Sequence, residues 1–317
     1  MPRVPAALCA LALVSTACSG GDDAEPERAQ AVPAEWAAVA DAPTARQEVA
    51  AAAVGGRVWV VGGFVDGAAS TLVEVYDPAT DTWQRGPDLP HPVHHAMAAE
   101  SDGLLHVAGG FGADGQPTDR AFRLAGGADR WEELPRMPVP RGAGAAATAS
   151  RRLVVVGGVG PLGHVDRVAI FDGADWSQGR SIPTGRDHLA AASDGSYLYA
   201  VGGRVGSLEA NVDALERYDP AADEWEDLPD MPTARGGLGA AFLGGLLVVA
   251  GGESPGGTNE EVEAFDPESG GWSSLPPMPT PRHGLGTAVV DNVLYALVGG
   301  TVPGFGADAT VEALRLS

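Results

Sequence analysis

The sequence of 317 residues contains no lysine, and this absence shapes its charge. All 20 basic residues are arginine, against 42 aspartate and glutamate residues, so the formal net charge is −22. A chain this acidic repels the phosphates of nucleic acids and of anionic lipid head groups. The composition therefore excludes nucleic acid as an expected partner.

Cysteine is nearly absent as well. The two cysteines, Cys9 and Cys18, both lie within the first twenty residues, so the rest of the chain can form no internal disulfide. The apolar run at residues 6–14 is too short to span a bilayer as a helix. It follows Arg3 and precedes the small residues 15–17, an order typical of a signal for export.

This start resembles a bacterial lipoprotein signal over residues 1–17, although Ser15 stands where that signal usually has leucine. The resemblance implies that Cys18 is lipidated and becomes the first residue of an exported protein. The protein would then be anchored at the cell membrane or envelope through its lipid alone. A plain secretory signal with a chance cysteine is the alternative. Residues 18–34 are polar and acidic, and we expect them to form a disordered tether.

Sequence motifs of catalysis are missing too. The sequence contains no Gly-x-Ser-x-Gly, no His-Glu-x-x-His and no phosphate-binding loop. Pairs such as Asp66-Gly67 are typical of turns and do not indicate a calcium loop. We therefore expect no cofactor and no metal, and the sequence favours a protein that is not an enzyme.

Glycine and proline, in contrast, are abundant, with 45 and 25 residues, which favours many short strands joined by turns. Glycine pairs that end an apolar run recur every 45–49 residues, and they begin at Gly62, Gly109, Gly157, Gly202, Gly251 and Gly299. Tryptophans recur in step, at Trp36, Trp83, Trp131, Trp176, Trp225 and Trp272. These features indicate six copies of one structural unit.

Each copy predicts four strands, which we name a to d. Strand a is rich in small residues, strand b is continuously apolar and ends at the glycine pair, strand c alternates, and strand d carries the tryptophan. After Gly299 the chain has room for a strand c but contains no further tryptophan. We expect the strand around Trp36 to supply the missing strand d, because this closes the ring and leaves no free sheet edge.

The glycine pair followed by an aromatic residue and a tryptophan, at a period near fifty, resembles the kelch repeat. The resemblance implies an all-β fold, a six-bladed kelch β-propeller over residues 35–317. It also implies that the d–a and b–c loops share one face, on which a protein or glycan partner binds, and that the protein is a monomer. We expect a binding module of this kind.

Two groups of enzymes that share the kelch fold bear on alternative functions. Six-bladed kelch N-acetylneuraminate epimerases imply an alternative, an extracytoplasmic isomerase of acidic sugars. Galactose-oxidase relatives need a copper site with a Tyr–Cys crosslink, and the blades contain no cysteine. The resemblance therefore disfavours copper oxidase chemistry.

An arginine precedes strand a in five copies. These residues are Arg46, Arg141, Arg186, Arg235 and Arg282, and we expect His94 to take their place in the second copy. A residue repeated around a ring favours a shared structural role, in which the guanidinium bonds turn carbonyls. A ring of positive charge that binds a carboxylate is the alternative.

The residues that follow these arginines differ in every copy, as do the residues after each glycine pair. Because they have no shared structural role, they are the stronger candidates for binding. We expect Asp187 and His188 to be surface residues for this reason. The ligand-binding candidates are Glu48, Phe64, His95, Phe111, Arg186, Asp187, His188, Arg204, Glu253 and His283. Phe64 and Phe111 could stack on a sugar or anchor a peptide, or else pack beneath their own loops.

Overall fold

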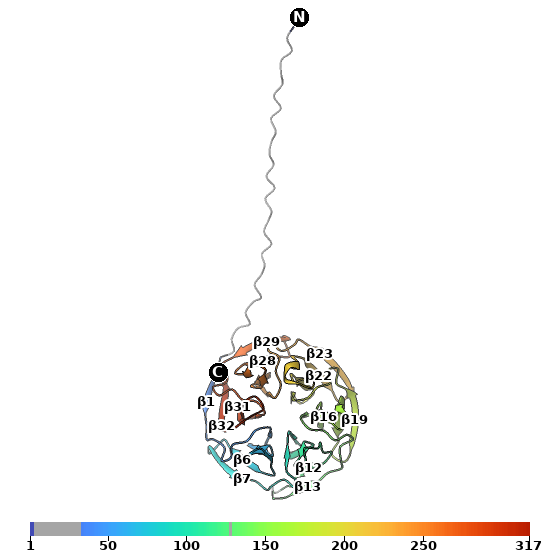
Figure 1. The fold of residues 1–317 in the computed structure, drawn as a ribbon, viewed down its shortest axis with the longest axis vertical. Helices are drawn as coiled ribbons and strands as arrows, with labels where there is room; N and C mark the ends of the chain where they lie inside the picture. Colours follow the sequence, from blue (N-terminus) through green and yellow to red (C-terminus); the bar gives the residue numbers. More distant parts are fainter. Residues whose placement is uncertain (3–32, 127–128) are drawn as a thin grey trace.

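The computed structural model describes residues 1–2, 33–126 and 129–317, and within them six four-stranded antiparallel sheets surround one axis (Figure 1). This arrangement confirms the predicted six-bladed propeller. Nearly all of the expected signal segment, Cys18 and nearly all of the expected tether lie outside the described residues. The described residues include no helix with the length and apolar character needed to cross a membrane.

The first three blades follow the chain in order, each with its strands a to d. Blade 1 consists of β2 (Ala50–Val54), β3 (Arg57–Val61), β6 (Val73–Asp77) and β7 (Thr82–Arg85). Blade 2 consists of β9 (Met97–Ser101), β10 (Leu104–Ala108), β12 (Ala121–Leu124) and β13 (Trp131–Glu133). Blade 3 consists of β14 (Ala145–Ala149), β15 (Arg152–Val156), β18 (Arg167–Phe171) and β19 (Trp176–Ser181).

The last three blades complete the ring. Blade 4 consists of β20 (Ala190–Ser193), β21 (Leu198–Val201), β22 (Leu215–Asp219) and β23 (Glu224–Leu228). Blade 5 consists of β24 (Gly239–Leu243), β25 (Leu246–Ala250), β28 (Val262–Asp266) and β29 (Gly271–Leu275). Blade 6 consists of β30 (Gly286–Val290), β31 (Val293–Val302), β32 (Phe305–Leu316) and β1 (Ala34–Ala38).

Short elements lie in the b–c and d–a loops. They are the hairpins β4 (Phe64–Val65) with β5 (Ala68–Ala69), β16 (Val159–Gly160) with β17 (Gly163–His164), and β26 (Glu253–Ser254) with β27 (Gly257–Thr258), the pair β8 (Val93–His94) with β11 (Phe111–Gly112), and the 3-10 helix η1 (Leu208–Ala210). These loops share one face of the propeller, and they carry the candidate residues.

The strand order follows from side-chain size. The innermost strands, such as β2 and β14, are mostly alanine, because neighbouring innermost strands contact one another around the axis. Strand b of each blade is mostly apolar and mostly buried on both faces, as in β3 and β15. The core therefore lies between adjacent sheets, where large apolar side chains fill the wider outer space.

The ring closes through the N-terminal strand. β1 pairs antiparallel with β32, from Ala34 opposite Leu316 to Ala38 opposite Glu312, and lies beside it in Figure 1. Blade 6 thereby gains the strand d that its own end of the chain lacks. The predicted closure is confirmed.

The tryptophans of strand d join neighbouring blades. Each indole N–H donates to a backbone carbonyl of the preceding blade, over 2.8–3.2 Å. The pairs are Trp36 with Pro276, Trp83 with Ala40, Trp131 with Pro87, Trp176 with Pro135, Trp225 with Arg180 and Trp272 with Pro229.

Candidate functional site

One residue from each blade lies at the narrow mouth of the central channel, just before strand a. We call these six residues the axial ring, and they are Glu48, His95, Ala143, His188, Gly237 and Gly284. All have a left-handed backbone, with φ between 52° and 65°. Five successive N–H groups, from His95 to Gly284, each donate to the carbonyl of the preceding ring residue, over 2.8–3.0 Å. The backbone itself therefore fixes where each ring side chain begins.

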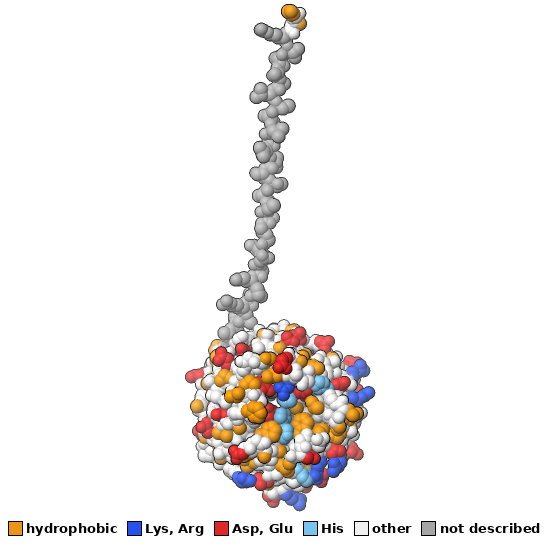
Figure 2. Space-filling view, in the orientation of Figure 1, with side chains coloured by type: hydrophobic (Ala, Val, Ile, Leu, Met, Phe, Trp, Pro, Cys, Tyr) orange, Lys and Arg blue, Asp and Glu red, His pale blue; other side chains and the backbone are white. Residues whose placement is uncertain are grey.

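Three members of the axial ring carry polar side chains that meet at the mouth. Glu48 Oε2 lies 3.0 Å from His95 Nε2, and that nitrogen lies 3.1 Å from His188 Nε2. Figure 2 shows histidine side chains gathered at the centre of this face, beside acidic and arginine side chains. The three groups thus offer one oxygen and two nitrogens to a shared point.

A second layer of charge surrounds these groups. The Asp187 carboxylate bonds His188 Nδ1 through one oxygen and His164 Nε2 through the other, the latter at 2.8 Å. Arg204 lies between two carboxylates, with its Nη1 2.9 Å from Glu253 and its Nε 3.5 Å from Asp187. This layer fixes the orientation of the His188 ring.

His283 connects the mouth to blade 6. Its Nδ1 lies 3.2 Å from Glu48 Oε1 and 3.6 Å from Glu253 Oε2, without hydrogen-bond alignment to either. Its Nε2 lies 3.1 Å from the Val302 carbonyl oxygen. The imidazole is fully buried, so it supports Glu48 from behind and does not face solvent.

The protonation of the mouth follows from these contacts. Burial alone would raise the pKa of Glu48, but the charge of His95 and the close approach of the His283 and His95 imidazoles outweigh it and hold that pKa well below its usual range. Burial lowers the pKa of His188 more than its bond to Asp187 raises it. The mouth therefore combines a carboxylate with a neutral imidazole near neutral pH.

The structure brings seven of the ten predicted candidates together at this mouth, namely Glu48, His95, Asp187, His188, Arg204, Glu253 and His283. One expectation about them is wrong: Asp187 is only 3% exposed and is no surface residue. His188 is only partly exposed. Contacts between loops of neighbouring blades bury these side chains, and a repeat pattern within one sequence does not indicate contacts between blades.

His164 belongs to the same network but was not predicted. It lies in the β16–β17 hairpin, outside the positions that the repeat comparison considers. The two phenylalanines lie on either side of His94, with ring centroids 4.0 Å (Phe64) and 5.4 Å (Phe111) from it. They form a three-ring stack beside the mouth that remains partly exposed.

The repeated arginines are structural. All five side chains are fully buried, and four pair with a carboxylate of strand c. Arg46, for example, bonds Glu74 at 2.9 Å and the carbonyl oxygens of Leu72 and Gly62 at 3.1 and 3.2 Å. Arg186 and Arg235 also donate to turn carbonyls, those of Thr184 at 2.8 Å and Thr233 at 2.9 Å, so the predicted bonding of turn carbonyls is confirmed in blades 4 and 5.

Arg186 shares this structural role. It bonds Glu216 and the carbonyl of Ala200 inside blade 4, so it is not available to a ligand at the mouth. Arg204 is the arginine that the structure places there. This corrects the sequence-based choice of Arg186 as a ligand contact.

Blade 2 departs from the pattern at two linked positions. In the other blades, a glycine of the preceding glycine pair donates its N–H to the carbonyl of the repeated arginine, as Gly110 does to Arg141. In blade 2 the corresponding bond runs from Gly63 to the carbonyl of Val93, so Val93, not His94, takes the arginine position. Phe122 lies opposite Val107, as Glu74 lies opposite Val60 in blade 1. An apolar pair therefore replaces the buried ion pair.

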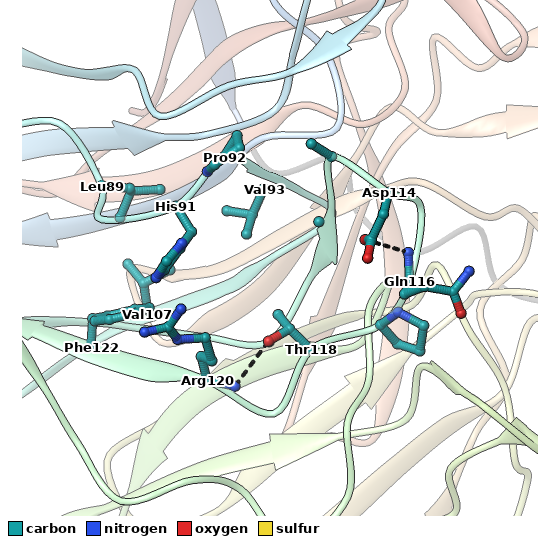
Figure 3. A pocket seen from close by; sticks show the side chains of 14 residues that line it. Leu89, His91, Pro92, Val93, Val107, Asp114, Gln116, Thr118, Arg120 and Phe122 are labelled. Carbon is teal, nitrogen blue, oxygen red and sulfur yellow. Dashed lines mark hydrogen bonds between the residues drawn. The ribbon is translucent and has the colours of Figure 1, made fainter.

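A pocket of about 450 Å³ opens where the missing guanidinium would lie (Figure 3). Its apolar wall is formed by Leu89, Val93, Val107 and Phe122, and its rim includes His91, Asp114, Gln116, Thr118 and Arg120. The d–a and b–c loops of blade 2 supply most of this lining, so the pocket opens on the same face as the axial mouth.

Comparisons with known proteins agree with this architecture. A family model of the kelch motif matches residues 45–90, 185–232 and 234–279. Kelch-like protein terF of Aspergillus terreus is 28% identical over 76% of this chain and 60% of its own length. Kelch-like protein 35 of Mus musculus is 26% identical over 70% of this chain and 30% of its own length.

A solved structure, that of YjhT, is 18% identical and has a TM-score of 0.74, and the match covers 86% of this chain and 95% of that one. The chain thus spans 60% or less of these two curated relatives but nearly all of a solved propeller. Six sheets, six tryptophan contacts and three matched motifs lead to one conclusion: the described part of the chain is a six-bladed β-propeller that carries kelch motifs.

Proposed function

We propose that this propeller is a binding module that holds a protein partner on its d–a/b–c face. In this proposal the blade 2 pocket anchors an apolar side chain of the partner, and a lipid on Cys18 tethers the exported protein to a membrane. The pocket is the observation that carries the proposal. At about 450 Å³, it falls within the range of about 300–1,000 Å³ that is usual for ligand sites.

The lining of the pocket favours a protein side chain over a sugar. Its wall is apolar, and two of the charged rim groups already have partners: Arg120 lies 3.0 Å from Glu133, and Asp114 accepts the N–H of Gln116 at 3.0 Å. A sugar needs many free donors and acceptors for its hydroxyls, and an apolar anchor needs only shape and burial. A leucine or an aromatic side chain of a partner meets that need.

The test fills the pocket with the protein's own ion pair. The double variant Val93→Arg with Phe122→Glu restores to blade 2 the pair that Arg46 and Glu74 form in blade 1. A peptide library selected on the parent should yield peptides with one large apolar residue in common. The filled variant should bind them at least ~10-fold more weakly.

A matched control separates pocket filling from added charge. Val205→Arg places an arginine on an exposed loop of blade 4, on the same face, and should leave peptide binding unchanged. Equal binding by the parent and the filled variant would remove the pocket from the proposal. Glycan-array binding that only the filled variant loses would assign the pocket to a sugar instead.

A second candidate function, isomerisation of an acidic sugar, is favoured by the axial mouth. Glu48 contacts His95 at 3.0 Å, and Arg204 pairs with Glu253 nearby, so a proton-transfer pair lies close to a cation. Anomer interconversion of N-acetylneuraminate, followed by NMR, should be faster with the parent than with Glu48→Gln. A rate equal to that in buffer would dismiss this candidate.

A further inference from the structure

The three polar residues of the axial ring converge from blades 1, 2 and 4 onto a single point. The donor atoms of Glu48, His95 and His188 all lie within 4.8 Å of one another. Two of the separations, at 3.0 and 3.1 Å, are close to those in a metal complex. Ligands about 2.0–2.1 Å from a tetrahedral zinc lie about 3.3 Å from one another.

The three groups offer more hydrogen-bond acceptors to one another than N–H donors. His188 Nδ1 bonds the Asp187 carboxylate, which places the proton of a neutral ring on Nδ1 and leaves a lone pair on Nε2. That lone pair faces His95 Nε2, which also faces Glu48. A single N–H on His95 would then serve both neighbours, whereas one cation would satisfy all three groups.

Supporting contacts orient each of the three groups. Asp187 holds His188, His94 Nδ1 lies within hydrogen-bond distance of His95 Nδ1, and His283 lies behind the second oxygen of Glu48. Histidines that bind metals typically bond a carboxylate or another acceptor through the nitrogen that does not bind the metal. The His188–Asp187 pair matches this arrangement.

The remaining ring residues leave space beside the cluster. Ala143 has only a methyl side chain and Gly237 and Gly284 have none, and a hollow of about 70 Å³ lies against the six residues. A water needs about 10–15 Å³ of such space, so the hollow has room for water as a further ligand. Two histidines, one carboxylate and a water form a ligand set that is typical of zinc sites with an open position.

We propose that Glu48, His95 and His188 form a binding site for one divalent transition-metal ion, preferentially zinc. Two imidazole nitrogens favour zinc over magnesium or calcium, which prefer all-oxygen ligand sets. This site differs from the sequence-based expectation of no metal. It does not depend on the proposed protein partner, because the blade 2 pocket takes no part in it.

The test is zinc binding by the full chain after treatment with a chelator. Calorimetric titration should show one zinc ion per chain, bound at least ~100-fold more weakly by His95→Ala and by His188→Ala. Glu224→Gln, which removes an exposed carboxylate on β23, should bind zinc like the parent. Cobalt in place of zinc should give the visible absorption bands of a four-coordinate ion, and His95→Ala should abolish them.

Circular dichroism of each variant shows whether it is folded. If an alanine variant fails to fold, the same titration with Glu48→Gln and His95→Gln shows whether these side chains bind zinc. The proposal is overturned if the folded parent binds no zinc. It is also overturned if the parent binds several ions weakly and the ring variants do not change this, since that result would mean adventitious binding to an acidic surface.

Discussion

Trp36 donates its indole N–H to the carbonyl oxygen of Pro276 at 3.0 Å, although 240 residues separate them in the chain. In blades 1 to 5, the tryptophan lies on the same continuous stretch of chain as its own sheet. In blade 6, Trp36 belongs to β1, and the rest of the sheet comes from the opposite end of the sequence. This contact therefore reports on the closure of the ring.

Trp36→Ala should lower the free energy of unfolding by ~2–4 kcal/mol, because it removes a large, partly buried side chain and one hydrogen bond. Urea denaturation measures this change. A chain that begins at Ala51 loses β1 entirely and should also aggregate, because β32 then presents a free edge. A chain that begins at Ala31 is the control. Equal melting of the two shortened chains would contradict this account of closure.

The buried arginines differ in their partners, and their variants should differ in stability. Arg235 pairs with Glu263, so Arg235→Met leaves a buried carboxylate without an opposite charge and should cost ~3–5 kcal/mol. Arg141 has no carboxylate partner among the described residues, and Ala169 takes the corresponding position on strand c. Arg141→Met should therefore be neutral or stabilising.

Thermal melts of the two methionine variants test this difference directly. Because both side chains are fully buried, loss of volume affects them alike. If Arg141→Met costs as much as Arg235→Met, the bonds to backbone carbonyls would be the dominant contribution, and the ion pair would be secondary.

Asp81 predicts a pH dependence of stability. It accepts the Ala40 N–H at 2.8 Å and the Tyr76 hydroxyl at 2.7 Å, and these bonds hold the pKa of the Asp81 carboxyl below its usual range. A pKa lower in the folded state than in the unfolded state stabilises the fold above the unfolded pKa. This stabilisation is lost as the pH falls through the folded pKa.

Asp81→Asn should therefore melt below the parent near about pH 7, and the difference should shrink below about pH 4. Melting curves across this range, with parent and variant side by side, provide the measurement. A difference that stays constant down to the lowest pH at which both are folded would mean that the Asp81 charge has no part in it.

Cys18 predicts where the protein is found. If Cys18 carries a lipid, as the first residues indicate, Cys18→Ala should move the protein from the membrane fraction to the soluble fraction. The mass of the mature chain should also fall by that of the lipid. An unchanged mass together with continued membrane association would contradict lipidation at this residue.

The repeat predicted the fold well because every blade packs the same kinds of side chain at the same strand positions. Small strands at the axis, apolar strands b and tryptophans on strand d are local patterns, and they recur in step. The site was less predictable because it exists only between blades. Asp187, for example, pairs with Arg204 at an interval that recurs in the other blades, but its contact with His164 joins loops of two different blades, and no spacing in the sequence indicates that contact.

The pocket of blade 2 was missed for a related reason. His94 was aligned with the arginines by chemical likeness, whereas backbone hydrogen bonds place Val93 there. The paired change to Phe122 is visible in strand c, because glutamate recurs at that position in four blades.

The axial ring also bears on how such a protein can change. Its closure depends on main-chain atoms, so the side chain at each ring position can vary without loss of the hydrogen bonds that define the channel. A Cβ atom at Gly237 would meet no atom closer than 3.4 Å, although its φ of 65° favours asparagine or aspartate among the alternatives to glycine. Single substitutions at such a position would add a fourth functional group to the channel mouth. New chemistry can thus arise here one residue at a time, on an unaltered scaffold.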